Sequence, residues 1–222
     1  MRRWGPTAIV VVLLSGTAIA FATTERQKLE KSPFSVVHVD GVFSPRHGPA
    51  AVSLSFRRPH LLTLQILDKN DRVIATLAEE RRVEAGTTIF RWSGKDVPDG
   101  FYRPKATLDT GREFTLENPI RLDSVAPTVR VLSYRPHVLR RRSKPRIRIS
   151  YDLSEAAHVR VYVNGHQKLE GGATKVLFQL YWYARRVNGR RLRPGRYRLQ
   201  LAAVDLAGNI GPRTHVFVVR VR

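Results

Sequence analysis

The chain of 222 residues contains no cysteine, a single methionine and few acidic residues. Without cysteine it can form no disulfide, use no thiol nucleophile and hold no thiolate-bound metal, so its fold must rest on packing alone. Asp and Glu number 18 against 39 Lys and Arg, which gives a net charge of +21 at pH 7. A chain this basic is expected to attract polyanions such as nucleic acid, acidic wall polymers or anionic lipid.

The positive charge is unevenly distributed along the chain. Residues 126–222 contain 21 Lys and Arg but only 4 Asp and Glu, whereas residues 1–125 contain 18 and 14. The second half therefore carries nearly all of the excess. Arg makes up 31 of the 39 basic residues, so GC-rich coding and simple solubility form a compositional alternative to a functional surface.

A long apolar run occurs at the N-terminus, where residues 7–22 follow two arginines. The arrangement predicts a signal peptide or a signal-anchor helix over residues 1–22, followed by a polar stalk over residues 23–33. The run is shorter than the roughly 20 residues that span a bilayer, and Ala22 ends a suitable cleavage site. We expect the remainder to be extracytoplasmic, either held by a single membrane pass or secreted after cleavage; an apolar cytoplasmic helix is the alternative.

One pattern of residues occurs twice, about ninety residues apart. A Trp is followed by a polar stretch, by Pro with Gly close behind, by an aromatic residue and then by alternating apolar residues. The copies are Trp92, Pro98, Gly100 and Tyr102, and Trp182, Pro194, Gly195 and Tyr197. Repetition at a domain-sized interval predicts two copies of one β-domain. We expect both Trp side chains in a core, with a carbohydrate-stacking surface as the alternative.

Short runs of alternating apolar residues, separated by turn-forming residues, cover most of the chain after the stalk. The first repeat has about seven such runs at intervals of eight to twelve residues, which is typical of a β-sandwich. Residues 36–43 are expected to form one continuous first strand. The pair Asn164-Gly165 predicts a two-residue type I′ hairpin turn, because both central residues of that turn need a positive φ.

The segment 123–127 ends in a proline, which forces extended backbone and indicates a short, stiff linker. We therefore predict an all-β protein of two tandem Ig-like or fibronectin-III-like β-sandwiches, over residues 34–125 and 126–222. The second sandwich is the strongly basic one.

Several motifs of the first domain resemble the Ig-like domain of flagellar hook-capping proteins, a domain widespread in bacterial surface and secreted proteins. They are Phe43-Ser44-Pro45, the Trp-x-Gly-x-Asp of residues 92–96, and Val97-Pro98-Asp99-Gly100-Phe101-Tyr102. Residues 123–127 and 205–209 are similar to the edges of bacterial Ig-like repeats. The resemblance covers about residues 34–222 and implies an Ig-like fold with a binding, spacing or display role.

The chain departs from that family in one loop and lacks the rest of a hook-capping protein. Many relatives continue after Phe-Ser-Pro with an acidic Asn-Gly-Asp-Gly-type loop, whereas this chain has Arg46-His47-Gly48-Pro49. A cation site in this loop is therefore not supported, and the resemblance does not imply a hook-capping role.

The sequence offers no arrangement typical of catalysis or of cofactor binding. It has no Gly-x-Ser-x-Gly elbow and no glycine-rich phosphate loop. His38 and Asp40 share one strand face and His47 lies beyond, but no third group is placed to complete a metal or acid–base site. We predict that the protein is not an enzyme and has no catalytic, metal or cofactor site.

Two basic clusters in the second domain are the candidate polyanion-binding residues. One lies in a loop that leads into a strand, and the other in the turn equivalent to residues 93–100. Guanidinium groups bind phosphate through two parallel hydrogen bonds, although solvated loops are an equal alternative. The candidates are Arg140, Arg141, Arg142, Lys144, Arg146, Arg190, Arg191, Arg193 and Arg196.

Taken together, these features predict a non-catalytic, exported, membrane-tethered spacer or interaction protein of the cell envelope. Its expected partners are an envelope protein or an acidic envelope polymer, with the membrane a third if the N-terminal helix is retained. The alternative function is a polyanion-binding protein that acts through the Arg-rich second domain on wall polymer, anionic lipid or extracellular nucleic acid, of which nucleic acid is not favoured. A third class, a carbohydrate accessory module, would use exposed tyrosines such as Tyr181 and Tyr183.

Overall fold

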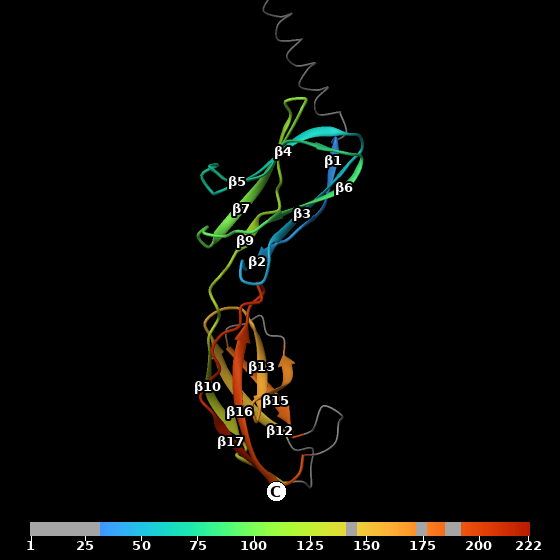
Figure 1. Cartoon of the computed structure of the whole chain (residues 1–222). Coiled ribbons are helices and arrows are strands. Elements are labelled where there is room, and N and C mark those ends of the chain that lie inside the picture. Colours follow the sequence, from blue (N-terminus) through green and yellow to red (C-terminus); the bar gives the residue numbers. More distant parts are fainter. Residues whose placement is uncertain (1–31, 141–145, 172–176, 185–191) are drawn as a thin grey trace, which may run out of the picture.

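The computed structural model describes residues 32–140, 146–171, 177–184 and 192–222. Their regular elements are all strands, arranged as two β-sandwiches that follow one another along the chain (Figure 1). The predicted all-β class with two tandem sandwiches is thus confirmed. Among these residues there is no helix of the length and apolarity needed to cross a membrane. The predicted N-terminal signal or anchor, residues 1–22, lies outside the described residues.

Domain 1 contains nine strands in two sheets that enclose one hydrophobic core. One sheet has the order β1-β3-β6, and the other has the order β2-β9-β7-β4-β5 with β8 paired to β7. The strands are β1 (Phe34–Val39), β2 (Val42–Phe43), β3 (Ala50–Phe56), β4 (His60–Leu67), β5 (Val73–Val83), β6 (Gly86–Trp92), β7 (Gly100–Leu108), β8 (Glu113–Thr115) and β9 (Ile120–Leu122).

The described part of domain 2 contains eight strands, again in two sheets around a core of its own. The three-stranded sheet has the order β10-β12-β15, and the five-stranded sheet has the order β11-β17-β16-β13-β14. The strands are β10 (Val129–Arg135), β11 (Val138–Leu139), β12 (Arg146–Leu153), β13 (His158–Val163), β14 (His166–Gly171), β15 (Leu177–Tyr183), β16 (Gly195–Val204) and β17 (Phe217–Val221).

In both domains the first strand breaks and changes sheet. In domain 1, β1 pairs antiparallel with β3, and β2 then pairs parallel with the last strand, β9. In domain 2, β10 likewise pairs antiparallel with β12, and β11 then pairs parallel with the last strand, β17. The prediction of one continuous strand over residues 36–43 is therefore wrong. The strand ends because the Asp40 carboxylate accepts a hydrogen bond from the Ala51 amide at 2.6 Å, while the Gly41 carbonyl accepts from the β9 residue Arg121.

The two tryptophans of the repeated pattern lie in equivalent cores. Each is 3% exposed, which confirms the core interpretation and excludes the stacking alternative for both residues. The Trp92 ring lies 5.0 Å from Tyr102, edge to face, and the Trp182 ring lies 6.4 Å from Tyr197. Buried aromatic rings of this size dominate the apolar area of a small sandwich, so each pair anchors its own domain.

The spacing of Pro, Gly and Tyr in the pattern has a structural cause. The Tyr102 hydroxyl donates to the Pro98 carbonyl at 2.6 Å, and the Tyr197 hydroxyl donates to the Arg193 carbonyl at 2.8 Å. In both domains the acceptor lies four residues before the tyrosine. The hydrogen bond closes the turn ahead of β7 or β16, so the motif fixes where the following strand begins.

The predicted Asn164-Gly165 hairpin is also confirmed. Asn164 has φ 50° and Gly165 has φ 85°, and Val163 pairs with His166 across the two-residue turn. A turn with two positive φ values matches the right-handed twist of the flanking strands, so it sets the register of β13 and β14.

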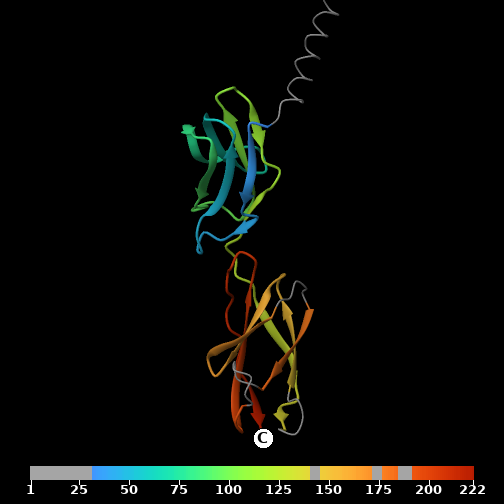
Figure 2. The same cartoon turned by 90° about the vertical axis from the view of Figure 1, so that its right-hand side faces the viewer.

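The linker is hydrogen-bonded to both domains. On the domain 1 side, the Ser124 amide donates to Asp99 at 2.9 Å. On the domain 2 side, the side-chain amide of Asn209 donates to the Asp123 carbonyl at 2.8 Å. Gly211 leaves room for Pro127, because a Cβ added to Gly211 would lie 1.7 Å from the Pro127 oxygen. The loop between β16 and β17 consequently lies beside the linker, between the two domains (Figure 2).

Candidate anion-binding surface

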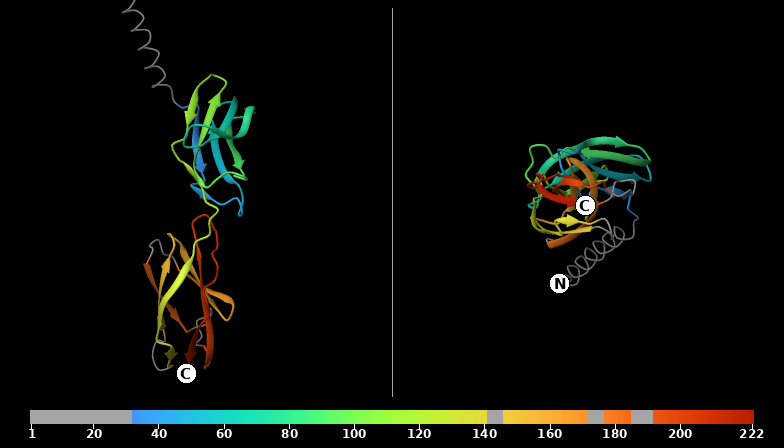
Figure 3. Two further views of the ribbon diagram at one scale, coloured as in Figure 1. Left: turned by 90° about the vertical axis from the view of Figure 1, so that its left-hand side faces the viewer. Right: turned by 90° about the horizontal axis from the view of Figure 1, so that it is seen from below.

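Charge in domain 2 is sorted along the length of the sandwich. Near the linker, Asp152 pairs with Arg130 at 3.1 Å, and Asp205 binds the Asn209 side chain at 2.8 Å. Glu155 belongs to the same end, because burial and then the charges of Asp123 and Asp205 raise its pKa. The C-terminus lies at the opposite end (Figure 3), and the strand ends there carry Arg135, Arg146, Arg196 and Arg220.

The three-stranded sheet presents three arginines on its outer face. Arg146 and Arg148 alternate along β12 with Ile147 and Ile149, which are fully buried, so both arginines must point away from the core. The β10 residue Arg135 is paired directly opposite Arg148.

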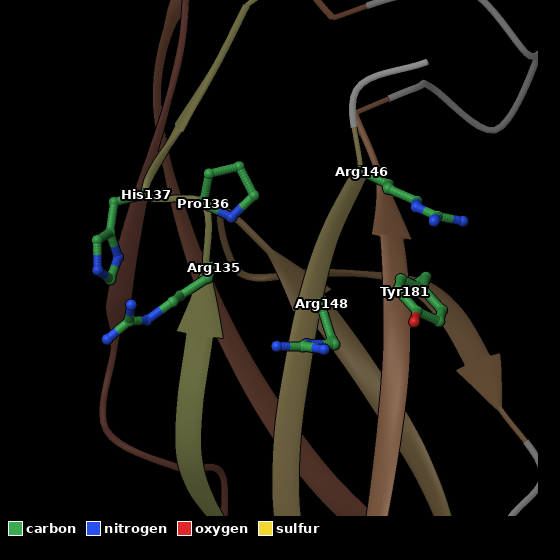
Figure 4. Close-up of a pocket in the computed structure, with 6 residues that line it drawn as sticks. All are labelled: Arg135, Pro136, His137, Arg146, Arg148 and Tyr181. Carbon is green, nitrogen blue, oxygen red and sulfur yellow. The ribbon is translucent and has the colours of Figure 1, made fainter. Parts of the chain in front are cut away.

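A pocket of about 710 Å³ lies over this part of the sheet. In Figure 4, His137 and Arg135 lie at one side, Arg146 and Tyr181 at the other, and Arg148 between them. The Arg146 guanidinium lies 4.6 Å from the centre of the Tyr181 ring, a cation–π contact that holds this side chain over β15. We call this site the three-strand pocket; its lining residues are Arg135, Pro136, His137, Arg146, Arg148 and Tyr181.

The arginines of the three-strand pocket have no acidic partner among the described residues. Like charges directly opposite each other on neighbouring strands destabilise a sheet by roughly 0.2–1 kcal/mol. The Arg135–Arg148 pair therefore works against folding. An anion bound between the two guanidinium groups would remove this repulsion and gain charge-assisted hydrogen bonds.

A second basic pocket, of about 770 Å³, lies on the five-stranded sheet. Arg196 on β16 is paired directly opposite Arg220 on β17, so the like-charge arrangement occurs a second time. The exposed Val218 lies on the same outer face of β17 as Arg220 and, with Val216, makes the floor partly apolar. We call this site the five-strand pocket; its lining residues are His137, Val138, Asn164, Arg196, Arg198, Val216, Val218 and Arg220.

His137 lines both pockets and lies at the edge between the two sheets. It occupies the short connection from β10, in one sheet, to β11, in the other. Its carbonyl accepts a hydrogen bond from the Arg220 amide at 3.0 Å, and its ring meets Tyr134 edge to face at 4.6 Å. The two pockets are thus neighbours around one edge of the sandwich.

The structure places only some of the predicted site residues. Arg146 lines the three-strand pocket and Arg196 the five-strand pocket, whereas Arg140 and Arg193 are exposed and line neither of the two. The other candidates lie outside the described residues: Arg141, Arg142, Lys144, Arg190 and Arg191.

Sequence reasoning missed Arg135, Arg148, Arg198 and Arg220 as site residues. Each lies within a strand with no other basic residue next to it in the sequence, and pairing between strands that are far apart in sequence brings them together. One signal was present: Arg alternates with a core residue in Arg146-Ile147-Arg148. Such alternation predicts arginines on the outer face of a strand.

The histidines form no second site in the described part of the chain. His38 lies 2.9 Å from Asp40 on an exposed strand; burial tends to raise the pKa of Asp40, but hydrogen bonds from Ala51 and His38 lower it overall. His60 is buried 3.0 Å from Asp109, and this hydrogen bond lowers the pKa of that carboxyl. No group of three or more His, Asp or Glu among the described residues could hold a metal ion.

Comparison with known proteins finds likeness in structure alone. No family model matches the chain, and no curated protein matches it in sequence. Among solved structures, the fibronectin(III)-like modules of Clostridium thermocellum CbhA match with a TM-score of 0.45 and 12% identity, over 85% of this chain and 92% of that one. The FN1–FN3 domains of chicken CNTN1 match with a TM-score of 0.45 and 15% identity, over 85% and 66%.

A bacterial ice-binding adhesin matches with a TM-score of 0.34 and 17% identity, over 86% of this chain and 66% of that one. The BSP domain of a biofilm-associated protein matches with a TM-score of 0.31 and 11% identity, and the chain covers 29% of its length. Likenesses this low show neither a family nor a role. The sheet order and the two separate cores make the chain an all-β protein of two tandem β-sandwiches.

Proposed function

We propose that this protein is a non-catalytic, extracytoplasmic module in which domain 1 acts as a spacer and domain 2 binds an anionic polymer of the cell envelope. The single observation that carries the proposal is the unpaired, like-charged Arg135–Arg148 pair beside Arg146 in the three-strand pocket. Folding alone does not favour this arrangement, whereas a bound anion does.

The geometry suits phosphate or carboxylate groups presented in series. Guanidinium groups keep their charge at any physiological pH and offer planar pairs of donors. Tyr181 adds an exposed ring beside them, 40% accessible, against which a sugar or another apolar part of the ligand could pack. The exposed arginines of the second domain would also speed association with any polyanion.

The joint between the domains supports the spacer role. Hydrogen bonds from the linker to Asp99 in domain 1 and from Asn209 in domain 2 hold the connection at both ends. A linker fixed in this way keeps the anion-binding end at a set distance from domain 1, and so from the membrane if residues 1–22 form an anchor.

The motifs that resemble the hook-capping Ig-like domain and the apolar N-terminal segment support a bacterial surface location. Membrane attachment through residues 1–22 and the identity of the envelope polymer stay predictions.

The salt dependence of binding tests the proposed function. We would titrate the full chain with fluorescently labelled inorganic polyphosphate at several salt concentrations and record anisotropy. Counterion release predicts that log Kd rises linearly with log salt, with a slope near the number of phosphates neutralised. Absence of polyphosphate binding at low salt would contradict the proposal.

A protein partner is the second candidate function. Among the strands that the structure describes, β15 lies at the edge of the three-stranded sheet and pairs with β12 alone. An edge of this kind can accept an added strand from another chain. Retention of one envelope protein on the immobilised chain through high salt would favour this candidate.

A further inference from the structure

We propose that the ligand is a flexible, linear phosphate polymer that binds both sheets of domain 2 at once by passing around the edge at His137. The inference rests on the proposed function, since it concerns the same anion-binding end. It adds the substrate class: a chain of phosphates that can turn sharply.

The first step is that two equivalent like-charge pairs occur on the two outer faces of one sandwich. Arg135 opposes Arg148 on the three-stranded sheet, and Arg196 opposes Arg220 on the five-stranded sheet. Both pairs lie at the end of domain 2 away from the linker, because the chain leaves β10 and enters β16 there. A single small anion can occupy only one of the two.

The second step is that the two pockets meet at His137, which lines both. At this residue the chain itself changes from one sheet to the other, and the His137 carbonyl is bonded to the amide of Arg220. The two basic pockets therefore adjoin around one edge of the sandwich, with about 710 Å³ of open space on one side and about 770 Å³ on the other.

The third step is that a ligand in contact with both arginine pairs must be flexible. The faces of a β-sandwich look in opposite directions, since two sheets about 10 Å apart separate them. Double-stranded DNA has a persistence length of about 150 base pairs, so a short duplex can lie along only one face. A flexible chain of phosphates can follow the edge and reach both arginine pairs.

Phosphate suits these pairs better than carboxylate does. A carboxylate directs its two oxygens to one side, where one guanidinium fork can bind both. A tetrahedral phosphate spreads its oxygens in space, so arginines on two neighbouring strands can reach it from different directions. Among the described residues that line the two pockets, every ionisable side chain other than Tyr181 and His137 is an arginine.

Two pockets that bind the same flexible ligand should increase its overall affinity, because the second contact forms at a high effective concentration. When a ligand spans both pockets, the second contact is intramolecular, and overall affinity can exceed that of either site by about 10²–10⁴. Loss of either arginine pair should then remove this gain, although the other pair is intact.

The experiment compares three full-length double variants. Arg135→Gln with Arg148→Gln removes the first pair, and Arg196→Gln with Arg220→Gln removes the second. Arg57→Gln with Arg58→Gln removes the same charge from exposed positions in domain 1 and serves as the matched control. Thermal unfolding of each variant establishes that its fold is kept.

The probes are tripolyphosphate, long-chain polyphosphate, a 30-nucleotide oligothymidylate and a 30-base-pair duplex. For long polyphosphate we expect each domain 2 variant to weaken binding at least about tenfold, and the control variant to change it less than about threefold. For tripolyphosphate, which is too short to span the edge, removal of one pair should leave the other site unchanged. Oligothymidylate should bind more tightly than the duplex, although the duplex carries about twice the charge.

The outcomes separate the two proposals. If no probe binds at low salt, the proposed function is wrong. If polyphosphate binds but the Arg196/Arg220 variant matches the control, or the duplex binds as tightly as the single strand, the anion site stands and the two-sheet inference is overturned. Polygalacturonate serves as the carboxylate source, and binding as tight as that of polyphosphate would overturn the assignment to phosphate.

Discussion

The two domains share one plan of strands and differ in how they use charge. Each has a first strand that changes sheet, a buried Trp near a Tyr, and a Tyr hydroxyl bonded to the carbonyl four residues before it. Domain 1 pairs several of its surface arginines and lysines with acids, whereas in the described part of domain 2 Asp152, Glu155 and Asp205 lie near the linker and the pocket arginines at the far end have no acidic partner.

The ion pairs show the difference directly. Domain 1 has several across its surface: Arg72–Asp68, Arg82–Glu84, Arg103–Asp71 and Lys105–Glu113. In the described part of domain 2, Arg130 pairs with Asp152 at 3.1 Å, close to the linker. The comparison teaches that interior residues fix this fold, while outward positions on the same strands are free to serve binding.

Loss of either core tryptophan should have the largest effect and should separate the domains. Trp92→Ala or Trp182→Ala is expected to cost roughly 3–5 kcal/mol, because a large buried ring is replaced by a cavity. Each change should lower the unfolding temperature of its own domain far more than that of the other. Calorimetry of the two variants, with Leu206→Ala as an exposed control, measures this.

Replacement of Gly211, at the joint between the two domains, should have the next largest effect on stability. In Gly211→Ala the new Cβ would lie 1.7 Å from the Pro127 oxygen, so the linker must move away from domain 2. Overpacking of this kind typically costs about 1–3 kcal/mol. Small-angle scattering should show a wider range of interdomain distances. Gly41→Ala is the control, since its Cβ would meet no atom within 4 Å; equal behaviour of the two variants would contradict a fixed joint.

The repeated tyrosine hydrogen bond should contribute about 1 kcal/mol to each domain. Tyr102→Phe should cost more than Tyr197→Phe, because Tyr102 is only 5% exposed and its loss leaves the Pro98 carbonyl without this donor inside the protein. Urea denaturation measures both. A larger loss for Tyr197→Phe would show that the two corners are not equivalent in the way we describe.

Removal of an arginine charge should change the stability of domain 2 in opposite directions at the two ends of the domain. Arg148→Gln removes a like-charge neighbour of Arg135 and should stabilise the domain by roughly 0.2–1 kcal/mol. Arg130→Gln breaks the exposed pair with Asp152 and should destabilise it by up to about 1 kcal/mol. Both effects should shrink in high salt. Destabilisation by Arg148→Gln at low salt would contradict the repulsion that we infer.

The smallest predicted effect is a pH dependence at the joint. Burial, together with Asp123 and Asp205, raises the pKa of Glu155. A carboxyl with a raised pKa in the folded state contributes stability below its unfolded value, and this contribution is lost as pH rises through the folded value. Glu155→Gln should therefore raise the unfolding temperature at pH 7 relative to wild type and change it less at pH 4. An equal shift of the unfolding temperature at pH 7 and pH 4 would argue against a charged Glu155 near the linker acids.

The sequence was sufficient to predict the repeat, the core tryptophans and the Asn164-Gly165 turn, because each depends on local backbone chemistry or on spacing along the chain. The break of the first strand was missed, since it depends on a contact between Asp40 and the distant Ala51. The Arg135–Arg148 pair was missed for the same reason. Cross-strand register joins residues that are apart in sequence, and a basic cluster in a loop is easier to see in the sequence than arginines spread over separate strands.

The central claim is that domain 2, rather than the net charge of the whole chain, binds the anionic polymer. The most direct measurement compares polyphosphate affinity at one moderate salt concentration for the Arg135→Gln/Arg148→Gln and Arg57→Gln/Arg58→Gln variants, which carry the same net charge. Our account predicts a loss of at least about tenfold for the first variant and little change for the second. Equal losses would mean that bulk charge, and not the arranged arginines of domain 2, is responsible for binding.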